Sequence, residues 1–141
     1  MPRSRTRRAW TLLEVMVVLV IIGVMLRLSA PLYHRAVEQA RTDVAAANLR
    51  AVWAAQRLYW LDQRQYAANF TDLAPLLDPS IASGSSSYTY ALVSTDGTTF
   101  TATATRIGSN IWSGQLTIDQ TGVVAGTIQD ESNVVITPGF Q

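Results

Sequence analysis

Residues 10–26 read Trp-Thr-Leu-Leu-Glu-Val-Met-Val-Val-Leu-Val-Ile-Ile-Gly-Val-Met-Leu, and Glu14 is their only charged side chain. A helix of this length spans roughly 25 Å, and extending it to Leu32 reaches the thickness of a bilayer core. From Val15 to Leu26 no side chain is polar. We therefore expect a membrane-spanning helix near the amino terminus.

The residues before this segment predict its orientation. They contain four basic and no acidic side chains: Arg3, Arg5, Arg7 and Arg8. Positively charged flanks stay on the cytoplasmic side of a membrane. The amino terminus is therefore expected in the cytoplasm, and everything after about residue 33 on the other side.

The overall composition excludes several kinds of protein. A chain of 141 residues allows one ordinary domain, and the absence of cysteine excludes a disulfide scaffold, a thiolate zinc site and a cysteine nucleophile. His34 is the only histidine, and neither a Gly-rich phosphate loop nor a Gly-x-Ser-x-Gly motif occurs. We expect no enzyme, no catalytic residue, no metal and no cofactor.

Three interpretations of the apolar segment compete. A cleaved secretory signal would need a cleavage site near Ser29-Ala30, but Pro31 follows that site and Arg27 precedes it. A twin-arginine signal starting at Arg7-Arg8 needs the same late site. The third interpretation, a retained helix that loses only its basic leader, fits these residues best.

Glu14 is unusual in such a helix. A carboxylate costs about 2.5 kcal/mol or more near the centre of a bilayer and less toward the interface. The simple alternative is an interfacial carboxylate that the helix dipole stabilises. Because intramembrane carboxylates generally have a charged partner, we expect Glu14 to be functional.

The residues Ala9-Trp10-Thr11-Leu12-Leu13-Glu14-Val15-Met16 resemble the class III signal of type IV pilins and type II secretion pseudopilins. The resemblance implies that a prepilin peptidase cuts between Ala9 and Trp10 and methylates the new amino terminus. Glu14 then becomes the fifth residue and Pro31 the twenty-second, where the family has its Glu and commonly a helix-bending Pro. Ala9 replaces the usual Gly, and Trp10 the usual Phe.

The resemblance implies a structural function and a set of partners. A single-pass prepilin would lie in the cytoplasmic (inner) membrane and then polymerise into an extracytoplasmic filament, with Glu14 paired to the Trp10 amine of a neighbour and Pro31 also serving assembly. The implied partners are other pilin copies, the peptidase, an inner-membrane assembly platform and lipid. Packing in the membrane is expected from Leu12, Leu13, Val17, Val18, Ile21 and Ile22.

Two alternatives to a pilus subunit remain open. One is a pseudopilin of a type II secretion or competence system. The other is a membrane-anchored binding module that never polymerises. Both alternatives keep the membrane-anchored helix. The pseudopilin assembles into a filament of a secretion or competence system, whereas the binding module does not assemble.

The helical pattern continues after Pro31. Apolar residues at steps of three or four form a stripe, on which we expect a small domain to lie: Tyr33, Val37, Ala40, Val44, Ala47, Ala51, Ala55 and Leu58. We therefore expect a leader at 1–9, a membrane and polymerisation helix at 10–32, its amphipathic continuation at 33–66 and a globular part at 67–141.

Arg50, Arg57 and Arg64 recur every seven residues and share a helix face. A nucleic-acid surface is conceivable, but a solvated face or contacts between subunits are favoured. Loss of the leader would leave seven basic against 10 acidic side chains, which counts against a general phosphate-binding surface.

From Tyr88 onward the period changes to two, which is typical of strands. Segments 88–93, 100–106 and 112–119 read as strands, Asp96-Gly97 as a hairpin turn, and 123–128 and 134–136 as weaker strands. The fold class is therefore α+β, with the long helix packed against an antiparallel sheet of three or four strands. A short helix is expected near 71–77 and a flexible loop at 80–87.

Two features of the carboxyl-terminal region stay open. The disulfide loop of many pilins is absent, so residues 119–141 must be held by other contacts. Asp119, Asp130 and Glu131 could contribute to a calcium site, but turn carboxylates in water are the favoured interpretation.

Overall fold

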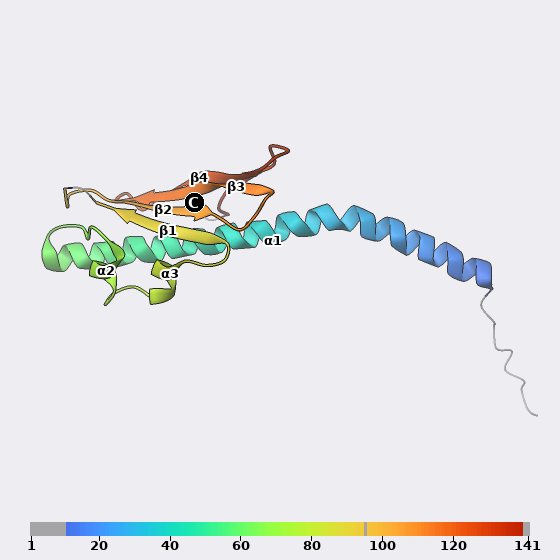
Figure 1. Ribbon diagram of the computed structural model, residues 1–141, viewed down its shortest axis with the longest axis horizontal. Coiled ribbons are helices and arrows are strands. Elements are labelled where there is room, and N and C mark those ends of the chain that lie inside the picture. Colours follow the sequence, from blue (N-terminus) through green and yellow to red (C-terminus); the bar gives the residue numbers. More distant parts are fainter. Residues whose placement is uncertain (1–10, 95, 140–141) are drawn as a thin grey trace, which may run out of the picture. The chain divides into compact units, whose positions relative to one another are not determined.

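The computed structural model describes residues 11–94 and 96–139, except for the side chains of residues 28–31. Two units form, Met1–Ala36 and Val37–Gln141. The helix α1 (Leu12–Gln63) starts in the first unit and ends in the second (Figure 1). This confirms the expected long amino-terminal helix.

The second unit combines part of α1 with two short helices and a sheet. The remaining elements are α2 (Phe70–Leu73), α3 (Pro79–Ser83), β1 (Tyr88–Val93), β2 (Thr101–Arg106), β3 (Trp112–Asp119), β4 (Val124–Asp130) and β5 (Val135–Ile136). The strands form an antiparallel meander in the order β1-β2-β3-β4-β5. Figure 1 shows the sheet lying along α1, with α2 and α3 beside the helix below β1.

Each strand has one buried and one exposed face, as its period of two predicts. In β2 the small Ala102 and Ala104 are buried against α1, while Thr101 and Thr105 are exposed. The core between the sheet and the helix contains Leu49, Val52, Phe100, Leu116, Ile118 and Ile128. The α+β fold class is thereby confirmed.

The number of strands was wrong. The sheet has five strands instead of three or four, because Val135 and Ile136 pair with Gln129 and Ile128. Two residues are a weak signal in a sequence. Burial of Ile136 in the core makes this short pairing stable.

The loop expected at 80–87 was also partly wrong, since α3 covers Pro79–Ser83. The Asp78 side chain caps this helix by accepting from the Ser80 N–H, and Pro79 occupies its first turn. Ile81 is buried and anchors the short helix to the core. A cap and one apolar contact therefore outweigh the Ser-rich composition.

The face of α1 under the sheet is not the stripe that the sequence indicated. The covered residues include Glu38, Thr42, Ala46, Leu49 and Gln56, whereas Val44 is 60% and Leu58 53% exposed. Of the expected stripe, Ala55 is fully buried. The predicted stripe was wrong because an apolar pattern cannot reveal buried polar positions, and Glu38, Thr42 and Gln56 are three such positions.

Glu38 and Arg106 explain how polar side chains can occupy this core. Arg106 Nε and Nη2 bind Glu38 Oε1 and Oε2, the second at 2.9 Å, so the end of β2 is joined to α1. Arg106 Nη1 also donates to the carbonyls of Ser87 (3.0 Å) and Ile107. The pair is buried, but every charged group has partners.

The carboxyl-terminal region is held without a disulfide. Gln39 Nε2 donates to the Thr137 carbonyl at 2.9 Å, and the Gly139 N–H donates to Asp43 Oδ1 at 2.8 Å. Together with buried Ile136 these contacts attach the last strand to the helix flank opposite β1.

The Glu38–Arg106 pair gives a test of this core. Glu38→Ala should lower the free energy of unfolding by about 3–5 kcal/mol, because it leaves the Arg106 charge buried without its partner. The double change Glu38→Leu with Arg106→Met should recover most of the loss. Urea unfolding of the detergent-extracted protein measures both.

The matched control is Asp62→Ala, which removes an exposed carboxylate from the same helix. It should change the unfolding free energy by less than about 0.5 kcal/mol. An equally small effect of Glu38→Ala would contradict the role assigned to the pair.

Candidate functional site

The residues expected at the processing site, Ala9 and Trp10, lie outside the described residues. Pro31 lies within α1, which is helical from Leu12 to Gln63.

Glu14 lies in the first turn of α1 and its side chain is exposed. The Glu14 N–H donates to Thr11 Oγ1 at 3.3 Å and to the Thr11 carbonyl at 3.1 Å. Thr11 thus caps the helix, and Thr-Leu-Leu-Glu matches the spacing of a capping box. Glu14 is therefore held at the helix start, next to the positive end of the dipole.

Residues 11–27 of the first unit present an unusually apolar surface. The six residues expected to pack in a membrane are all exposed, between 40% for Val18 and 78% for Leu12: Leu12, Leu13, Val17, Val18, Ile21 and Ile22. By length and composition α1 can cross a membrane, and its most apolar 18-residue window has no buried share within the chain. This surface needs lipid or other protein around it.

A second apolar surface lies on α1 within the second unit. We call it the outer seam: Ala40, Val44, Ala47, Ala51, Ala54, Leu58 and Leu61. All but half-buried Ala51 are exposed, and their alternating steps of four and three keep them on one side of a helix. At about 100° per residue, this seam lies about 180° from the face that the sheet covers.

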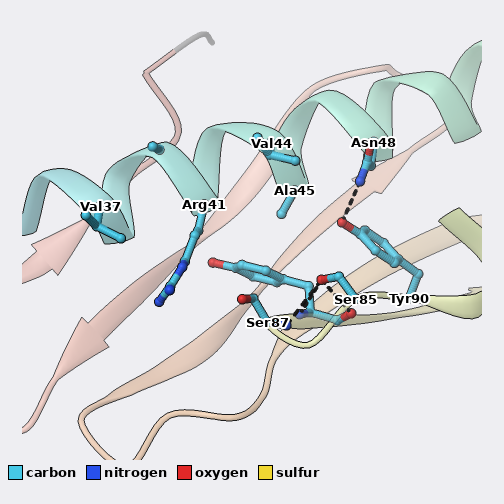
Figure 2. Close-up of a pocket in the computed structure, with 10 residues that line it drawn as sticks. Val37, Arg41, Val44, Ala45, Asn48, Ser85, Ser87 and Tyr90 are labelled. Atoms are coloured by element: carbon cyan, nitrogen blue, oxygen red, sulfur yellow. Dashed lines mark hydrogen bonds between the residues drawn. The ribbon is translucent and has the colours of Figure 1, made fainter. Parts of the chain in front are cut away.

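A groove lies beside the outer seam, between α1 and the edge of the sheet at β1 (Figure 2). Its volume is about 390 Å³. The helix contributes Val37, Ala40, Arg41, Val44, Ala45 and Asn48. The opposite wall contains Ser85, Ser87, Tyr88 and Tyr90.

Hydrogen bonds hold the walls of this groove in place. Asn48 Nδ2 donates to the Tyr90 hydroxyl at 2.9 Å (Figure 2), and the Tyr88 hydroxyl lies 3.1 Å from Thr42 Oγ1. Burial raises the pKa of Tyr88 and Tyr90, so both phenols stay neutral at physiological pH. The Ser87 carbonyl is fixed by Arg106.

The groove carries one unbalanced positive charge. Arg41 Nη1 lies 3.3 Å from Glu38 Oε2, and its side chain is 49% exposed. The same carboxylate already binds Arg106 with both oxygens. One carboxylate between two guanidinium groups leaves a local net charge of +1, on the exposed Arg41.

Two of the three arginines that the sequence placed on one helix face lie over tryptophan rings. The guanidinium of Arg57 lies 5.8 Å from the Trp53 ring centre, and that of Arg64 lies 5.2 Å from the Trp60 ring centre. Both distances allow a cation–π interaction. Arg64 follows the last residue of α1 and has a positive φ, so the helix face that the sequence indicated holds for Arg50 and Arg57 only, and the sequence did not predict the stacking.

The acidic residues considered for calcium lie at strand ends and in the turn that follows β4: Asp119 ends β3, Asp130 ends β4, and Glu131 comes next. The Asp119 carboxylate accepts from the Thr121 hydroxyl and N–H, which lowers its pKa, and the Asp130 carboxylate accepts from the N–H groups of Ser132 and Val134. Among residues 11–94 and 96–139, no three His, Asp or Glu side chains are grouped as a metal would require.

Sequence reasoning missed the groove and the unbalanced Arg41. Neither has a linear signal, because the groove joins residues 37–48 to residues 85–90. Glu38 and Arg106 could have been noticed as charges at otherwise apolar positions. Their pairing across 68 residues depends on the fold.

Comparison with known proteins gives matches over both parts of the chain. The family model "Prokaryotic N-terminal methylation motif" matches residues 4–26. The model "Type IV minor pilin ComP, DNA uptake sequence receptor" matches residues 31–115. No solved structure gives a significant match.

A curated relative is the type II secretion system core protein G of Pseudomonas aeruginosa, which is 34% identical over 75 residues. That alignment covers 53% of each chain, so this chain spans about half the length of the relative. The ComP model covers more than half of the chain and agrees with the long helix and the antiparallel sheet. The chain therefore belongs to the type IV pilin family, in the group that the ComP minor pilin model describes.

Proposed function

We propose that this protein is a structural subunit of a bacterial type IV pilus or related filament. The prepilin is inserted in the cytoplasmic membrane, loses residues 1–9 by cleavage between Ala9 and Trp10, and is N-methylated at Trp10. An assembly platform in the inner membrane then extracts it, and α1 packs it into the filament. Residues 10–32 serve as the polymerisation segment, and residues 67–141 belong to the globular part.

The outer seam is the observation that carries this proposal. Small and apolar residues at three- and four-residue steps continue further back through the sequence as Tyr33, Ala30, Leu26, Gly23, Leu19, Met16 and Leu12, on a stripe that turns by about 20° around a straight helix for every seven residues. Small and apolar residues at this spacing are typical of helices that pack closely against other helices. The sheet lies on the opposite face, so the seam stays exposed for other copies.

The Glu14 side chain would take its partner from the neighbouring copy. A carboxylate that is buried in a filament core is costly unless it is paired. The amine of Trp10 exists only after cleavage, so processing would supply the counter-charge. This links removal of the leader to competence for assembly.

A pseudopilin function is the first alternative, and the relative from Pseudomonas aeruginosa supports it. Both functions use the same membrane insertion, processing and helix packing. The membrane-anchored module that never polymerises is the second alternative. Purified filaments that contain the chain would exclude the second alternative but not the first.

Glu14→Gln should leave cleavage intact and reduce incorporation into filaments at least about tenfold, because the buried Trp10 ammonium loses its counter-charge. Intact mass and amino-terminal sequence report the cleavage, and the amount of sheared filament reports the incorporation. Asp72→Asn, an exposed acid in α2, is the control and should assemble normally. Normal assembly of Glu14→Gln would rule out the proposed pairing.

Ala54→Glu should leave the stability of the single chain almost unchanged, because Ala54 is exposed and Glu is a good helix former. It should prevent filament formation, because it places a charge in the outer seam. Ala125→Glu on the exposed face of β4 is the matched control. Thermal unfolding and filament yield separate the two effects, and filaments of Ala54→Glu at normal yield would refute packing through the seam.

A second candidate function is DNA binding during uptake. The description of the matching family and the Arg57–Trp53 and Arg64–Trp60 pairs favour it. Both tryptophans are half-buried, and guanidinium groups beside aromatic rings can contact both phosphates and bases. The processed chain would carry a negative net charge, which counts against strong binding to DNA.

Duplex DNA should then bind the processed protein in a salt-dependent manner, as measured by fluorescence anisotropy. Arg57→Ala should weaken this binding about three- to tenfold, whereas Arg41→Ala, away from the tryptophans, should have a smaller effect. No binding at low salt would end this candidate function and leave the structural one unaffected.

A further inference from the structure

The groove beside β1 combines apolar side chains with one exposed positive charge. Its helix side is apolar, but Ala40 and Val44 also belong to the outer seam, so Val37 and the half-buried Tyr90 of β1 form the apolar surface that remains for another segment. The exposed Arg41 lies along it with the uncompensated charge of the Glu38, Arg41 and Arg106 cluster. An apolar segment that also carries a carboxylate would complement both properties.

The opposite edge of the same sheet carries such a segment. The turn between β4 and β5 contains exposed Glu131, and Val135 after it is 46% exposed. Among the described residues Glu131 has no hydrogen bond or ion pair, in contrast to Asp130. The Asp130 carboxylate binds the N–H groups of Ser132 (2.9 Å) and Val134 (2.7 Å), so the turn is well ordered before any contact.

The groove and the turn lie at the same end of the sheet. Tyr88, in the groove wall, is paired with Arg106 at the end of β2. In the next two strands Thr105 is paired with Gln115, and Gln115 with Thr127. The neighbouring positions across the sheet therefore run from Tyr88 in β1 to Ile128 in β4, which lies three residues before Glu131.

Around α1 the two features lie on either side of the outer seam. Gln39 and Asp43 bind the segment that follows β5, whereas Val37 and Arg41 line the groove. At about 100° per residue these two helix faces are about 160° apart, with the outer seam between them. If the seam faces a filament axis, the groove and the turn face neighbours on opposite sides.

From this arrangement we propose that the groove receives the Glu131–Val135 turn of a neighbouring copy, with Glu131 paired to Arg41 and Val135 against Val37 and the Tyr90 ring, on the side of the groove away from the outer seam. The contact joins different surfaces of the two copies, and such head-to-tail contacts extend into open assemblies when they do not close into a ring. It adds a lateral contact between globular parts to the helix packing. The inference rests on the proposed function, since it requires polymerisation.

The absence of cysteine makes a direct test straightforward. Ser87→Cys in the groove wall and Ser132→Cys in the turn should form a disulfide between copies in assembled filaments, because a disulfide needs Cα atoms within about 4.4–6.8 Å. Oxidation followed by non-reducing electrophoresis should show a ladder of linked subunits. The control pair, Ser87→Cys with Ser113→Cys on the exposed face of β3, should give none.

Charge reversal tests the polar half of the contact without new cysteines. Arg41→Glu should lower filament yield about tenfold, and Glu131→Arg should do the same. The double change should restore most of the yield, because it re-creates the pair with opposite polarity. Thermal unfolding of each variant identifies any loss of filament yield that arises from misfolding. If a charge-reversed variant misfolds, the neutral change at the same position, Arg41→Gln or Glu131→Gln, is used in its place and should also lower the yield.

The outcomes separate the two proposals. Filaments without the Ser87–Ser132 ladder, or without rescue by the double reversal, overturn this inference and leave the proposed function intact. If the unmodified chain forms no filaments, the proposed function fails and the lateral contact fails with it. A ladder together with rescue supports both.

Discussion

The apolar surface of α1 is larger than one chain of this size can cover. A five-stranded sheet and two short helices bury one face of α1 within the second unit, and residues 11–27 and 32–36 of the first unit stay exposed. Exposed apolar surface on this scale indicates contact with lipid or protein. The rest of the molecule is consistent with a helix that moves from contact with lipid to contact with other copies of the chain.

The buried Glu38–Arg106 pair allows the sheet to lie on one defined face of that helix. An apolar stripe is available on the opposite side of α1, so hydrophobicity alone does not determine which side the sheet covers. A bidentate ion pair that also binds two backbone carbonyls has strict geometry and a high cost when it is broken. It thereby leaves the Ala-rich outer seam uncovered.

The same cluster connects the core to the surface. Arg106 holds the Ser87 carbonyl and lies 5.6 Å from the Tyr88 ring, so it positions one wall of the groove. Because Glu38 is shared with Arg41, the surface arginine keeps an unbalanced charge beside the groove. Core and groove are therefore built from one set of interactions.

Linear patterns in the sequence determined the long helix and four of the five strands, because each depends on local periodicity or turn chemistry. They also determined the amino-terminal signal, since its residues act as a linear motif. Only the tertiary structure decided which face of α1 is buried, that Val135–Ile136 forms a fifth strand, and that Arg41 lies beside a groove. The physical reason is that these features depend on side chains far apart in the sequence, such as Glu38 and Arg106, whose interaction energy appears only when the fold brings them together.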